Sequence, residues 1–174
     1  MGAPKALVRD ADGTSWLLRS VTALREGGCD RVTVVLGAAA DEAGSLLAGQ
    51  DVEVVVAERW AEGMGASLRA GLSAVAASDD LALLLTLVDL PDVGPRVVRR
   101  LVGLPVTATT LARAAYDGTP GHPVVIGREH WAGVAAEAHG DQGARAYLSR
   151  HTVDLVECGD LATGRDVDAP TDVR

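Results

Sequence analysis

The residue best suited to chemistry follows the most apolar segment of the sequence. Residues 81–88 (LALLLTLV) form a nearly continuous apolar run, and Asp89 comes directly after it. A carboxylate at the end of a buried strand loses solvation energy unless a cation lies beside it. A divalent metal ion or a basic side chain would supply that cation, whereas a helix cap would use the carboxylate structurally. Because Asp92 and Gly94 are better placed to begin the next helix, we expect Asp89 to be functional.

A second acidic segment lies near the end of the sequence, at residues 165–172 (RDVDAPTD). Asp166 and Asp168 alternate, so in an extended chain they point to opposite sides and only one of them faces a given site. Two converging carboxylates would hold Mg²⁺, which prefers hard oxygen ligands and leaves room for substrate phosphates. A solvated chain end is the structural alternative.

Residues 63–72 (GMGASLRAGL) form a loop of small residues that opens a helix. Around Gly63, Gly65 and Ser67, backbone N–H groups at the start of a helix would favour anions or the polar edges of a ligand. The spacing matches neither the dinucleotide-binding fingerprint nor the Walker loop. A simple helix cap is the alternative reading.

Polar residues in three other segments have both a functional and a structural interpretation. His122 is either a catalytic or binding group or a hydrogen-bonded turn residue. Asp141 is either a site residue or an N-cap, and Arg145 either reaches an anion or is a surface charge. Lys5 is by default a surface lysine.

The elements that position these residues alternate along the chain. Apolar periodicity predicts strands at 31–37, 51–57, 81–88, 110–118, 122–127 and 153–157 and helices at 15–26, 39–49, 63–77, 92–103, 128–138 and 142–150. This alternation is typical of a three-layer α/β fold with a mostly parallel sheet. We expect 81–88 to be a central strand, and residues 1–174 to form a single domain.

The predicted helix at 15–26 breaks the alternation. No convincing strand precedes it, because residues 6–8 (ALV) are the only apolar material before it. A crossover helix without its incoming strand buries one face against an incomplete partner. The pattern therefore predicts a sheet that lacks its first strand.

Composition excludes several classes of protein. The 174 residues are 48% hydrophobic and 23% charged, which is typical of one globular domain. A net charge of −8 opposes general nucleic-acid binding, and no apolar run is long enough to cross a membrane. Two distant cysteines predict neither a disulfide scaffold nor a zinc site, and we expect a cytoplasmic protein.

Read together, the motifs resemble the MobA-like nucleotidyltransferases, with a Rossmann-like fold, and most of all their molybdenum cofactor cytidylyltransferase branch. The resemblance covers essentially the whole chain. It is carried, in order, by MGAPK (1–5), WAEGMGASLRAGL (60–72), LVDLP (87–91), GHPVVIG (121–127), GDQGAR (140–145) and DVDAPTD (166–172).

The resemblance implies that CMP is transferred from CTP to the phosphate of a molybdopterin-type acceptor, with release of pyrophosphate. It implies Mg²⁺ bound by Asp89 and Asp168, with Lys5 and Asp89 as the catalytic residues. It places Lys5 on the triphosphate and Gly63, Gly65 and Ser67 against the base and ribose. It places His122, Asp141 and Arg145 beside the acceptor.

One segment of the family pattern has no counterpart. Family members carry a strand and a glycine-rich loop (LAAGxGxR) immediately before the segment that matches residues 1–5. Either the start codon is assigned too far downstream or the chain is genuinely shortened. We expect the sheet to lack its central first strand, with weakened triphosphate binding and either low stability or a compensating pairing.

Two other functions are compatible with the motifs. Some chains that resemble this family have a redox activity, the reduction of nicotine blue, but no flavin or nicotinamide fingerprint occurs in this sequence. A non-catalytic accessory protein, which holds the finished cofactor for a molybdoenzyme, would not need the triphosphate loop. Within the transferase interpretation, GTP is the alternative to CTP.

Overall fold

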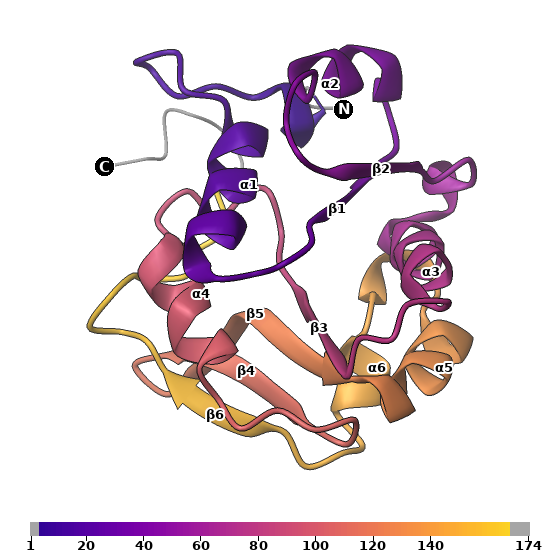
Figure 1. Cartoon of the computed structure of the whole chain (residues 1–174), viewed down its shortest axis with the longest axis vertical. Coiled ribbons are helices and arrows are strands. Elements are labelled where there is room, and N and C mark those ends of the chain that lie inside the picture. Colours follow the sequence, from indigo (N-terminus) through magenta and orange to yellow (C-terminus); the bar gives the residue numbers. More distant parts are fainter. Residues whose placement is uncertain (1–3, 168–174) are drawn as a thin grey trace.

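The computed structural model describes residues 4–167, and its elements follow the predicted order of an α/β fold (Figure 1). The helices are α1 (Trp16–Gly27), α2 (Ala40–Leu46), α3 (Met64–Val75), α4 (Pro95–Val102), α5 (Arg128–Glu137) and α6 (Arg145–Leu148). The strands are β1 (Thr33–Leu36), β2 (Glu53–Val56), β3 (Ala82–Leu85), β4 (Leu111–Tyr116), β5 (Thr119–Gly127) and β6 (Asp154–Glu157). Three short 3₁₀ helices are η1 (Lys5–Leu7), η2 (Trp60–Glu62) and η3 (Gly140–Gln142).

The strands of the described chain form two sheets. One has two parallel strands, β1 and β2, and the other has the order β3-β5-β4-β6. Strand β5 runs antiparallel to both β3 and β4, whereas β4 and β6 are parallel, so the larger sheet is mixed. The turn between β4 and β5 lies at Asp117 and Gly118, both with positive φ (50° and 76°). A two-residue turn of this conformation matches strand twist, and β5 therefore begins earlier than the predicted 122.

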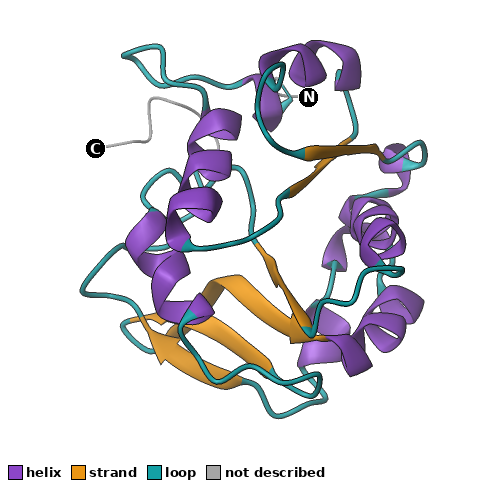
Figure 2. Ribbon diagram, viewed as in Figure 1, coloured by secondary structure: helices purple, strands orange, loops and turns teal. Residues whose placement is uncertain are grey.

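Strand β3 differs from the prediction of a central strand over 81–88. It ends at Leu85, lies at the edge of its sheet, and its residues are only partly buried. Within residues 4–167 no strand pairs with its second edge, so β1–β2 and β3–β5 stay in separate sheets (Figure 2). Because β3 ends at Leu85, Asp89 lies in the following turn rather than directly at the strand end.

Helices cover both faces of the larger sheet, as a three-layer fold requires (Figure 1). One core cluster joins the sheet to α3, α5 and α6 and includes Leu72, Ile126, Val134 and Leu148. Another joins the opposite face to α4 through Val97 and Leu101. Helix α1 packs along α4 on that side. The two faces are therefore covered by different helices, and the side on which a site residue projects decides its neighbours.

Local sequence signals explain both ends of α1 and the start of α4. Ser15 caps α1, because its Oγ accepts a hydrogen bond from the Leu18 N–H (3.4 Å), and Gly28 ends the helix with φ 102°. Pro95 opens α4 in its first turn. The helix predicted at 142–150 is shorter, because η3 and Gly143 (φ 53°) occupy its first residues and α6 spans only Arg145–Leu148. No helix in the described part of the chain is long and apolar enough to span a membrane.

Candidate active site

Three distant segments meet around Asp89. The Lys5 ammonium, in η1, lies 3.5 Å from Asp89 Oδ2. Lys5 Nζ also donates a hydrogen bond to the Val167 carbonyl (2.7 Å), and the Val167 N–H donates to the Asp89 carbonyl (2.9 Å). The structure therefore brings two of the predicted site residues, Lys5 and Asp89, into contact beside the segment that carries the second acidic motif.

The Asp89 carboxylate is suited to a cation. Its Oδ1 is buried and has no hydrogen-bond partner among the described residues. A buried carboxylate oxygen without a partner costs free energy, which a bound metal ion would offset. Residues 4–167 contain no cluster of three or more potential metal-ligating side chains. Asp168, the second predicted ligand, lies outside the described residues and follows Val167 directly in the sequence.

The predicted glycine loop packs against the segment that contains Asp141. A Cβ at Gly63 would lie 2.6 Å from Asp141 Oδ1, and Gly63 has φ 107°, a conformation that favours glycine. A Cβ at Gly65 would lie 2.7 Å from the Ala138 carbonyl oxygen. These glycines thus permit two backbone segments to pack closely together. The prediction of a ligand-binding loop did not include this structural role. Ser67 lies partly buried in the first turn of α3.

His122 lies in β5, in a segment held from both sides. The Tyr116 hydroxyl donates a hydrogen bond to the His122 carbonyl (2.7 Å), and Arg113 Nε donates to the Gly121 carbonyl (3.0 Å). Burial, assisted by the nearby positive charge of Arg113, lowers the pKa of His122 to about 4. At neutral pH the imidazole is uncharged, so it offers one donor and one acceptor rather than a positive charge.

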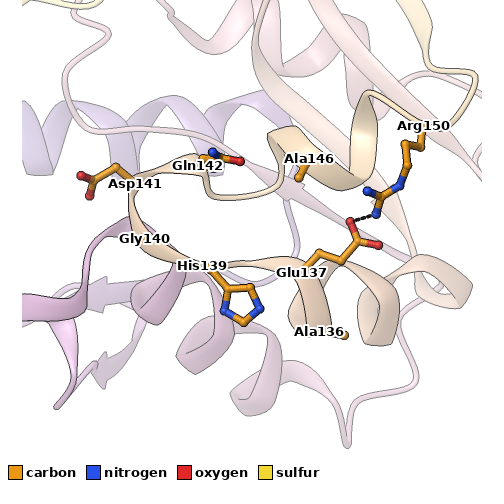
Figure 3. Close-up of a pocket in the computed structure, with 8 residues that line it drawn as sticks. All are labelled: Ala136, Glu137, His139, Gly140, Asp141, Gln142, Ala146 and Arg150. Carbon is orange, nitrogen blue, oxygen red and sulfur yellow. Dashed lines mark ion pairs between the residues drawn. The ribbon is translucent and has the colours of Figure 1, made fainter.

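A shallow hollow of about 560 Å³ lies between α5 and α6 (Figure 3). Asp141 lies at one end and the Glu137–Arg150 ion pair at the other (Figure 3). The hollow is not lined by Lys5 or Asp89. The remaining lining residues are Ala136, His139, Gly140, Gln142 and Ala146. Because the strongest chemical features lie elsewhere, this hollow alone does not define the site.

Sequence reasoning missed two arginines. Arg69, within the glycine-loop motif, donates hydrogen bonds to the Ala138 carbonyl and to Glu62, which ties α3 to the chain before η3. Arg113 is half-buried in β4, where burial and, next, the charge of Arg145 lower its pKa. A lone charge among small apolar residues in LARAAY was the signal that could have identified Arg113. Arg145 itself is exposed at the start of α6.

The fold is that of the nucleotidyltransferases. Residues 1–155 match the family model described as the MobA-like NTP transferase domain. The chain belongs to the MobA-like NTP transferase family, as the motifs predicted.

Proteins that resemble this chain carry names that state different activities. A nicotine blue oxidoreductase from Paenarthrobacter nicotinovorans is 34% identical over 95% of this chain and 83% of its own length. Rv0371c from Mycobacterium tuberculosis, in a structure with manganese, is 28% identical, with a TM-score of 0.78 over 98% of this chain and 90% of its own. A nucleotidyl transferase from Methanothermobacter has the same fold, with a TM-score of 0.80 at 22% identity over 97% of this chain and 81% of its own.

Proposed function

We propose that the protein transfers CMP from CTP to the phosphate of a molybdopterin-type acceptor, with Mg²⁺ as the metal and pyrophosphate as the second product. The observation that carries this proposal is the contact between Lys5 and Asp89, whose buried Oδ1 has no hydrogen-bond partner within residues 4–167. A cation beside a carboxylate that lacks a partner is suited to a ligand that brings both a metal ion and phosphates. GTP is the alternative nucleotide.

In this proposal Asp89, together with Asp168, holds the metal ion. When bound, the ion neutralises charge on the triphosphate and on the leaving pyrophosphate. Lys5 binds the triphosphate as well, because its ammonium is held next to Asp89 and therefore next to the proposed metal ion. Transfer of this kind depends on positioning and charge neutralisation, and the acceptor phosphate is itself the nucleophile, so no catalytic serine or cysteine is needed.

The other predicted residues divide between the two substrates. Gly63, Gly65 and Ser67 at the start of α3 lie against the nucleoside, and the tight packing of this loop on η3 makes its shape rigid. The acceptor lies beside His122, Asp141 and Arg145. A molybdoenzyme that receives the finished cofactor is the expected macromolecular partner.

The test is pyrophosphate release from CTP with Mg²⁺ and molybdopterin. We expect Asp89→Asn to lower the rate about a hundredfold or more, because the amide neither binds the metal ion strongly nor pairs with Lys5. Asp79→Asn is the matched control, since Asp79 is exposed and forms no ion pair in residues 4–167. Wild-type activity in the Asp89→Asn protein would contradict the proposal.

The oxidoreductase relative supports a second candidate function, reduction of a nicotine-blue type dye by NAD(P)H. Thermal denaturation separates the candidates, because a ligand at about 100 times its Kd stabilises the folded state by about 2.7 kcal/mol. Protection by CTP with Mg²⁺ supports the transferase, and protection by NADPH alone supports the oxidoreductase. Protection by molybdopterin alone, without nucleotide, supports an accessory role in cofactor delivery.

A further inference from the structure

Arg113 is a half-buried charge without an acidic partner in residues 4–167. Its Nε is bound to the Gly121 carbonyl, but no carboxylate in the described residues forms an ion pair with it. The chain has 24 acidic and 16 basic residues, so acidic partners are abundant. A half-buried guanidinium with free N–H donors costs free energy until an anion or water satisfies them.

The sheet places Arg113 on the same side as α6. In β4, Leu111 belongs to the core cluster under α3, α5 and α6, whereas Ala112 belongs to the cluster under α4. Side chains alternate along a strand, so Arg113 projects to the same side as Leu111. Its cross-strand partner Val124 belongs to that cluster too, as does Ala144, the residue before Arg145.

Arg145 follows Ala144 directly, and after burial its positive charge is the second cause that lowers the pKa of Arg113, so the two guanidiniums act on each other. It forms no ion pair with any described carboxylate. Asp141, the acidic residue closest in sequence, is directed toward Gly63 instead. Two like charges repel each other, and a shared anion removes that repulsion while it fills the free N–H donors. The neutral imidazole of His122 lies close to Arg113 and provides a further polar group.

We propose that Arg113 and Arg145 form an anion-binding pair that holds the phosphate monoester of the acceptor next to His122. This inference rests on the proposed function and adds Arg113 as an acceptor-binding residue. A guanidinium pair suits a phosphate because its planar N–H donors match two phosphate oxygens. The same chemistry could come from the nucleotide's own phosphates, so the experiment must separate the two sources.

The experiment titrates the full-length protein with inorganic phosphate at low salt and follows backbone amide resonances by NMR. We expect the amides of Gly121, His122 and Arg145 to shift and saturate. Arg113→Met and Arg145→Gln should each weaken phosphate binding about tenfold, as expected for the loss of one charge-assisted contact. Arg113→Lys, which keeps the charge, should restore part of the affinity. Arg96→Gln, an exposed arginine of α4, is the matched control and should change nothing.

The nucleotide arm uses CTP with Mg²⁺ on the same proteins. We expect Arg113→Met and Arg145→Gln to bind CTP as the wild type does. Equal weakening of CTP and phosphate would overturn the inference, because the pair would then serve the nucleotide. Unchanged phosphate binding in Arg145→Gln would also overturn it, and this exposed position keeps the test valid even if Arg113→Met does not fold. Failure of the wild type to bind CTP would instead count against the proposed function.

Discussion

The two sheets contain similar residues but differ in packing. In β5, Val124, Val125 and Ile126 are at most 4% exposed, whereas in β2 Val54 and Val56 are 42% and 53% exposed. Both segments read as β-branched apolar runs. The apolar pattern alone therefore does not determine how much surface a strand buries.

The number of neighbouring strands and helices explains this difference in burial between β5 and β2. Strand β5 has a strand on each side, with Trp131 and Val134 packed over one face and Val97 and Leu101 over the other. Strand β2 pairs only with β1 in the described chain, and α3 approaches one of its faces while the other stays partly open. A valine contributes to stability in proportion to the apolar area it buries, so the two sheets should respond differently to the same substitution.

The largest expected difference comes from one substitution made in both sheets. We expect Val124→Ala to lower the free energy of unfolding by about 2–3 kcal/mol, because it removes two buried methyl groups and leaves a cavity. Val54→Ala should change it by less than about 0.5 kcal/mol. Urea unfolding of both variants measures these values, and equal losses would show that the β1–β2 sheet is as well packed as β5.

A second matched pair of substitutions replaces a glycine by alanine in two helices, one packed on the larger sheet and one packed on the β1–β2 sheet. A Cβ at Gly133 in α5 would clash with the Tyr147 ring, which is stacked on His151 with centroids 4.0 Å apart and hydrogen-bonded to His130 (2.8 Å). We expect Gly133→Ala to cost about 1–3 kcal/mol of stability, because this ring has no room to move.

The second substitution of this pair is Gly71→Ala in α3. Its added Cβ would lie 3.0 Å from Val35 Cγ2, in the loosely packed β1–β2 sheet. If Val35 moves by a few tenths of an ångström, the better helix propensity of alanine should raise stability by about 0.5 kcal/mol. Thermal unfolding compares the two variants, and destabilisation by Gly71→Ala would mean that β1 is held as firmly as β5.

A pH dependence is also expected, and it belongs to the larger sheet. Because the pKa of His122 is lowered to about 4 on folding, the unfolded chain binds a proton below about pH 6.5 that the folded chain does not. Stability should therefore fall as the pH drops from 6.5 toward 4, by about 1 kcal/mol per pH unit. Urea unfolding of His122→Gln should show a shallower slope over this range. Identical slopes would show that His122 is hydrated in the folded protein.

The sequence predicted the order of elements well, because each element has a local signal. Helix α1 begins next to the predicted residue 15, and α3 begins at Met64 within the predicted glycine loop. The prediction of β3 as a central strand was wrong. The apolar residues of the segment favour a strand, but the place of that strand in the sheet depends on which other strands pair with it. Of the candidate site, the motifs led to Lys5 and Asp89, and the structure places them in contact.

Arg113 marks the limit of sequence reasoning about the site. Its importance rests on the lack of a carboxylate partner among the residues the structure describes and on the charge of Arg145, which is 32 positions away in the chain. The close approach of Gly65 to Ala138 is likewise a contact between distant segments. Neither has a local pattern, since a residue's charge environment depends on what the fold brings beside it.

By itself the sequence determined the α/β alternation, the helix caps and the family motifs, because periodicity and capping depend on residues a few positions apart. Only the tertiary structure decided that Val124 is buried and Val54 is not, that Asp89 Oδ1 has no partner in the described part of the chain, and that the charge of Arg145 acts on Arg113. These properties depend on solvent exclusion and on charges from remote segments, and both arise only when the chain has folded.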